Sequence, residues 1–77
     1  VIMRKPSKEI LAALAKNVRR FRLENDMSQE LLAEKCGLHR TYIGSIERGE
    51  RNATLSTLEV LAETFNVSIA QLLNNNE

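Results

Sequence analysis

The chain has 77 residues, of which 43% are hydrophobic and 27% charged, and this is the composition of one small globular domain spanning residues 1–77. No apolar run approaches the ~20 residues that a membrane span needs and no secretory signal pattern is present, so we expect a cytoplasmic protein. A chain this short buries only about 60% of its unfolded surface, so its own core is marginal and dimerisation would stabilise it.

The charges are unevenly distributed, although the net charge is only +1. Residues 1–51 contain all 11 Lys and Arg residues and carry a net charge of +4, whereas residues 52–77 carry −3. This asymmetry fits a polyanionic partner for the first part and a protein partner for the second. It fits an ordinary mixed surface equally well.

The first predicted helix runs from Ser7 to Glu24, with Ser7 as its N-cap. Its apolar stripe follows the helical period through Leu11, Leu14, Val18 and Phe21. Almost the whole chain keeps this period of 3.6 residues, and no segment alternates as a strand does. The pattern therefore predicts an all-α fold.

Two shorter helices are expected next. Ser28 is placed to cap the second helix, and Gly37 can end it in the left-handed conformation. The third helix is expected from about Arg40 to Arg48, with Gly49 as its stop.

The fourth helix is expected to begin after Thr54 and to end at Phe65, although Ser56 and Glu59 offer a competing capping box. Residues 67–72 have the pattern of a capping box with a hydrophobic staple, which opens a short fifth helix. The five helices predict one compact bundle.

Cys36 and His39 are the only cysteine and the only histidine. A single cysteine excludes an intramolecular disulfide and suits a reducing cytosol. No second ligand joins the histidine, so we expect no metal site and no cofactor. No nucleophile–base pair or phosphate-binding loop is present, which argues against an enzyme.

The third helix has an unusual polar side. Ile43 and Ile46 define its buried side, and the opposite side carries Thr41, Gly44, Ser45 and Arg48. Small side chains at the centre of this side let the helix backbone approach a large surface, such as the major groove of DNA, which is wide enough for one helix. The alternative is a small-residue seam that packs against another helix.

The preceding helix favours DNA. The helix-turn-helix arrangement needs a polar first turn, a small residue at the crossing, a turn residue and two apolar anchors. This chain supplies them, in that order, as Gln29, Ala33, Gly37, Ile43 and Ile46. In that arrangement the second of the two helices enters the major groove. The predicted helix-turn-helix core spans about residues 28–48.

Three segments carry a resemblance to a known family: SQELLAEKCGL, YIGSIERG and TLEVLAETFNV. Over residues 15–73 the chain resembles the Cro/cI-type (XRE) helix-turn-helix regulators of phages and bacteria, which implies a lambda-repressor-like DNA-binding domain. The run HRTYIGSIERGERN is similar to the controller proteins of restriction–modification systems, which are small dimeric transcription regulators.

The resemblance implies contacts with double-stranded DNA through Ser28, Gln29, His39, Arg40, Thr41, Tyr42, Ser45, Arg48, Arg51 and Asn52. Gln29 would hydrogen-bond a phosphate at the positive end of its helix. Arg40, Thr41 and Ser45 would face bases in the major groove. Tyr42 would press on the DNA backbone or, alternatively, pack on the preceding helix as a half-buried aromatic.

Four further positions have roles implied by the resemblance. Arg51 and Asn52 match a loop that grips phosphates, while Arg48 either touches a phosphate or is solvated. His39 replaces the small polar cap usual in the family, so we expect an irregular start of the third helix or a phosphate contact.

The resemblance also implies a buried ion pair between Arg22 and Glu47. Such a pair would join the first helix to the recognition helix and would belong to the scaffold. Breaking it would strand one buried charge.

Apolar residues are abundant between about residues 55 and 73, more than so small a domain can bury. We expect a two-fold dimer interface formed by Leu55, Leu58, Phe65, Val67, Ile69, Leu72 and Leu73. Such a dimer would present two recognition helices ~34 Å apart. The alternative is a DNA-binding fragment of a larger repressor whose missing domain covered this surface.

The predicted function is a sequence-specific transcriptional regulator that binds a roughly two-fold symmetric operator as a homodimer. It would act by occupancy, blocking or recruiting RNA polymerase near a promoter, with no small-molecule ligand. The alternative class is an antitoxin-like protein-interaction module.

Overall fold

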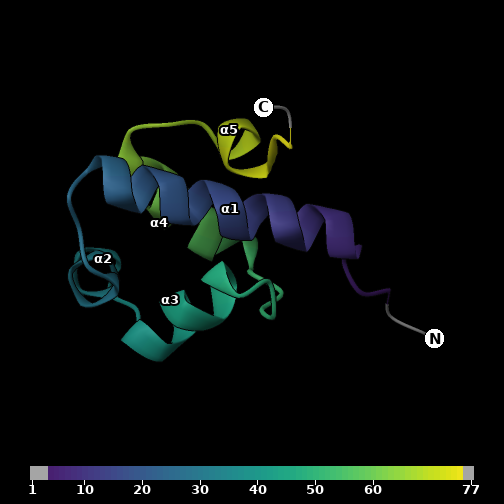
Figure 1. Ribbon diagram of the computed structural model, residues 1–77, viewed down its shortest axis with the longest axis horizontal. Coiled ribbons are helices and arrows are strands. Elements are labelled where there is room, and N and C mark those ends of the chain that lie inside the picture. The colour runs from purple at the N-terminus through teal and green to yellow at the C-terminus, as the bar shows by residue number, and fades with distance from the viewer. Residues whose placement is uncertain (1–3, 76–77) are drawn as a thin grey trace.

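The computed structural model describes residues 4–75, and within that range it contains five α-helices and no strand (Figure 1). In chain order they are α1 (Lys8–Glu24), α2 (Gln29–Cys36), α3 (Arg40–Glu47), α4 (Leu55–Phe65) and α5 (Ile69–Leu73). The predicted all-α five-helix bundle is confirmed. None of the described helices is long and apolar enough to cross a membrane.

The helices begin where their capping side chains predict. The hydroxyls of Ser28, Thr54 and Ser68 each accept a hydrogen bond from the backbone N–H three residues ahead. The cap at Thr54 places the start of α4 at Leu55, so the competing capping box is not used. Gly37 ends α2 with φ of 68°, a left-handed conformation that glycine adopts without steric cost.

Helix α1 crosses the middle of the molecule, with α2 and α3 on one side and α5 on the other (Figure 1). The largest fully buried side chains come from all five helices: Val18, Leu32, Ile43, Ile46, Leu61 and Leu72. Because α3 contributes two of them, its orientation is set by the core. On its opposite side Thr41 and Arg48 are exposed.

Three residues predicted for a dimer interface belong to this core instead. Leu58, Phe65 and Leu72 are only 7%, 6% and 0% exposed, so they have no surface to offer a second subunit. This part of the prediction was wrong because a one-sided apolar stripe does not reveal whether it faces the chain's own core or a partner. Leu55 is 76% exposed, whereas Val67, Ile69 and Leu73 are half-buried and pack against the core.

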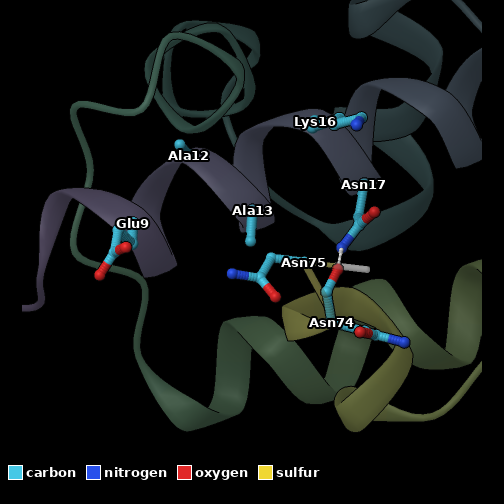
Figure 2. A pocket seen from close by; sticks show the side chains of 7 residues that line it. All are labelled: Glu9, Ala12, Ala13, Lys16, Asn17, Asn74 and Asn75. Carbon is cyan, nitrogen blue, oxygen red and sulfur yellow. Dashed lines mark hydrogen bonds between the residues drawn. The ribbon is translucent and has the colours of Figure 1, made fainter. Parts of the chain in front are cut away.

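Asn17 fastens the C-terminal end of the fold to α1. Its side chain is 4% exposed, and its Nδ2 donates to the carbonyl oxygens of Leu72 at 2.8 Å and Asn74 at 2.7 Å. Figure 2 shows the amide of Asn17 directed at Asn74. The last carbonyls of a helix lack partners within the helix, so this one side chain caps the short helix α5 from outside.

Candidate nucleic-acid interface

Helices α2 and α3 form a shallow groove on the exposed side of α3. It has a volume of about 310 Å³ and is lined by Gln29, Arg40, Thr41, Gly44 and Arg48. Gln29 comes from the first turn of α2, where the helix dipole is positive, and the others come from α3 and its C-cap. The structure therefore brings together four of the ten predicted DNA-contacting residues around a glycine.

A buried ion pair holds α3 against α1, as the resemblance implied. Arg22 Nε donates to Glu47 Oε2 at 2.6 Å and Arg22 Nη2 donates to Glu47 Oε1 at 2.9 Å, so the contact is bidentate. The two side chains are only 10% and 4% exposed. Arg22 Nη1 also donates to the carbonyl oxygen of Met27. The hydrogen bond to Glu47 raises the pKa of Arg22, and burial partly offsets this.

Gln29 is held in place by the same carboxylate. Its Nε2 donates to Glu47 Oε1 at 3.1 Å, and its Oε1 lies beside Gly44. An amide nitrogen carries two hydrogens, so one donor of Gln29 remains for a phosphate. Ser28 is already used as the N-cap of α2, because its Oγ accepts from the backbone N–H of Leu31 at 3.0 Å.

The start of α3 is regular because His39 is its cap. His39 Nδ1 accepts from the backbone N–H of Thr41 at 3.1 Å and lies 2.8 Å from Thr41 Oγ1. The expected irregular start was therefore wrong. The ring nitrogen accepts a hydrogen bond from a backbone N–H that has no partner within the helix, as a serine oxygen would.

Arg40 is exposed at the same end of α3 and forms an ion pair that the sequence did not indicate. Its Nη1 lies 2.9 Å from Oε2 of Glu30, and the two side chains are 64% and 70% exposed. An exposed pair of this kind stabilises by about 0–1 kcal/mol, so the guanidinium can leave Glu30 for a stronger ligand at little cost. Glu30 and Arg40 lie on different helices, so the period of a single helix does not reveal this pair.

Ser45 does not lie on the exposed side of α3. It is 7% exposed, its hydroxyl donates to the carbonyl oxygen of Tyr42 at 2.7 Å, and Arg51 Nε donates to its oxygen at 3.3 Å. The expectation of an accessible Ser45 was wrong because a wheel of one helix does not include the loop that folds back over it.

Tyr42 and Arg51 pack on each other beside Ser45. The Arg51 guanidinium carbon lies 4.8 Å from the centre of the Tyr42 ring, within cation–π distance. The Tyr42 hydroxyl lies 3.3 Å from Oγ1 of Thr57, the residue whose backbone N–H is capped at the start of α4. Tyr42 is half-buried, as its alternative interpretation expected, but these contacts are with the following loop and α4, and packing on α2 stays a prediction.

Arg48 and Asn52 lie at the far end of the surface. Arg48 is exposed and pairs with Glu50, with 3.3 Å between Nε and Oε1. Asn52 is exposed but does not line the α2–α3 groove; it lines a small apolar cavity together with Pro6 and Leu73. Among residues 4–75 no cluster of His, Cys, Asp and Glu could hold a metal ion.

A family model described as Helix-turn-helix matches residues 18–72, which include this whole surface. The chain belongs to the helix-turn-helix family. Control protein C.SmaI of Serratia marcescens is 60% identical over 65 residues, covering 84% of this chain and 77% of that protein.

Two solved structures are also similar. A hypothetical transcription factor, NHTF from Neisseria, matches 96% of this chain and 86% of its own, with a TM-score of 0.82 and 40% identity. The restriction-modification controller protein C.AhdI from Aeromonas hydrophila matches 80% of this chain and 94% of its own, with a TM-score of 0.76 and 35% identity. The XRE-type resemblance is thus confirmed. This helix-turn-helix protein is a transcription regulator similar to restriction–modification controller proteins, and not an enzyme.

Proposed function

We propose that the regulator binds a two-fold symmetric operator as a homodimer, with α3 of each subunit in a major groove, and serves as the controller of a restriction–modification system. The observation that carries this proposal is the surface around Gly44. Gln29, Arg40, Thr41 and Arg48 surround Gly44, which is buried next to the flexible ends of Gln29 and Arg48. Because Gly44 has no side chain, the backbone of α3 can come close to base edges once Gln29 and Arg48 turn outward to the DNA.

Each side chain of this surface has a chemical role in the proposal. Arg40 gives up its exposed contact with Glu30 and donates to O6 and N7 of a guanine in bidentate fashion. The Thr41 hydroxyl or methyl group contacts the neighbouring base. Gln29, held by Glu47, donates its second amide hydrogen to a phosphate at the positive end of α2.

The dimer contact is assigned to the exposed Leu55 and to the half-buried Val67, Ile69 and Leu73. Residues 52–77 contain no Lys or Arg, which suits contact with protein more than with DNA. A two-fold axis there would place both copies of α3 on one side of the duplex, ~34 Å apart. Binding beside a promoter would then block or recruit RNA polymerase as the protein accumulates.

The test is selection of binders from a random DNA duplex library, followed by affinity measurements at two salt concentrations. Enrichment of inverted half-sites about one helical turn apart is the expected result. Weak binding without enrichment, lost as salt rises, would mean that the surface contacts only phosphates and would refute a sequence-specific function.

Two variants separate base contact from phosphate contact on the selected duplex. Arg40→Ala is expected to relax the preference at one base pair by ~1–3 kcal/mol, whereas Gln29→Ala weakens binding to all sequences alike. Lys35→Ala, an exposed cation at the end of α2, is the control that removes a charge outside the surface. Wild-type affinity and preference in both variants would show that the surface is wrongly assigned.

A further inference from the structure

A second groove lies between α1 and the C-terminal end of α3. It has a volume of about 390 Å³, and its lining includes four basic side chains: Lys8, Lys16, Arg19 and Arg48. Ala12 and Ala15 lie between these cations on α1, and their short side chains leave space in the groove next to the charged groups. None of these α1 residues was expected to contact DNA.

The lining of the groove carries a net positive charge, although Arg48 also pairs with Glu50 beside it. Its only acidic lining residue is Glu47, whose carboxylate is neutralised by the bidentate pair with Arg22. Lys8 and Arg19 are exposed, and among residues 4–75 no carboxylate lies within ion-pair distance of either. Like charges held on one helix face repel one another, and a polyanion relieves this repulsion.

This groove adjoins the α2–α3 surface, from which α3 is proposed to enter the major groove of the DNA. Arg48 lines both grooves, so the basic face of α1 continues the surface formed by Gln29, Arg40 and Thr41. From Lys8 to Arg19 this face extends about 17 Å along α1, the length of about five base pairs.

We propose that this groove holds the phosphate backbone of the DNA beside the half-site that α3 contacts, with Lys8 and Arg19 as phosphate ligands. The inference rests on the proposed function and adds a contact from α1 to the α2–α3 surface. Because phosphates carry no sequence information, these residues contribute affinity and orientation but no base preference.

The experiment measures the affinity of the full chain for its selected duplex over a range of salt concentrations. Lys8→Gln and Arg19→Gln are each expected to lower the slope of log affinity against log salt by ~0.9, the value for one phosphate contact. A fourfold rise in salt then weakens the wild type about 3.5-fold more than either variant. Preference among operator sequences should not change.

Two matched variants separate contact from net charge. Lys35→Gln removes an equal charge from the exposed surface of α2 and should keep the wild-type slope, while Arg19→Lys keeps the charge in the groove and should also keep it. The contact is then located with duplexes that carry one uncharged methylphosphonate at each flanking position. The wild type should lose affinity at a particular flanking phosphate, and Arg19→Gln should be insensitive to that substitution.

Two results would overturn the inference. Unchanged slopes in both groove variants, together with normal operator selectivity, would show that α1 does not contact the backbone while the proposed function stands. A wild-type protein that selects no operator would remove the proposed function and this inference together.

Discussion

The bidentate pair between Arg22 and Glu47 allows the sharpest prediction for stability. Glu47→Gln removes the buried carboxylate charge but keeps the side-chain shape, so the Arg22 guanidinium is left 10% exposed with no counter-charge. Removing one member of a buried pair costs ~3–5 kcal/mol. A domain of this size has a total stability of about 4–12 kcal/mol, so the variant should lose a large fraction of its free energy of unfolding.

Urea unfolding followed by circular dichroism measures this effect as a change in the free energy of unfolding. The matched control is Glu50→Gln, because Glu50 forms an exposed ion pair with Arg48 and its loss should cost less than ~1 kcal/mol. The double variant Arg22→Met, Glu47→Leu removes both charges and should recover most of the stability. If Glu47→Gln were as mild as Glu50→Gln, the buried pair would not be what holds α3 on α1.

The pH dependence of this effect has a defined sign. The hydrogen bond to Glu47 raises the pKa of Arg22 above its ordinary value. A group whose pKa is higher in the folded protein than in the unfolded chain contributes its full stabilisation below the unfolded-state pKa. It loses this contribution only as the pH rises through the folded-state pKa. The stability difference between Glu47→Gln and the wild type should therefore stay constant from neutral pH to about pH 10.

Three further predictions concern Gly44, Asn17 and Cys36. Gly44→Ala should raise stability by about 0.5–1 kcal/mol in thermal unfolding, because the new methyl group meets only the flexible ends of Arg48, at 3.1 Å, and Gln29, at 3.6 Å. The same variant should weaken operator binding, and tighter binding would contradict the proposed approach of α3. Asn17→Ala should cost about 1–3 kcal/mol by removing the donor to the buried Leu72 carbonyl at the end of α5, and unchanged hydrogen exchange in α5 would refute that role. Burial raises the pKa of the Cys36 thiol, so a thiol reagent at neutral pH should label the folded protein more slowly than the urea-unfolded chain. For the same reason the free energy of unfolding should fall as the pH rises beyond 9.0, the ordinary pKa of the thiol. Equal labelling rates would show that the thiol is not shielded.

Local patterns in the sequence were enough to determine the helices. Caps such as Ser28, Thr54 and Ser68 act on a backbone N–H three residues away, and Gly37 acts on its own backbone, so their effects can be derived from neighbouring residues alone. The apolar period likewise identified Ile43 and Ile46 as the buried side of α3. The helix-turn-helix arrangement followed from these short-range rules.

Only the tertiary structure decided which polar and apolar faces remain free. Ser45 is covered by Arg51 from the following loop, and Leu72 is buried against the rest of the bundle although its stripe also suited a dimer. Asn17 caps a helix 55 residues away, and Arg19 and Arg48 line the same groove from different helices. Such contacts join segments far apart in the chain. Their partners are set by how helices pack, and no periodicity within a single helix contains that information.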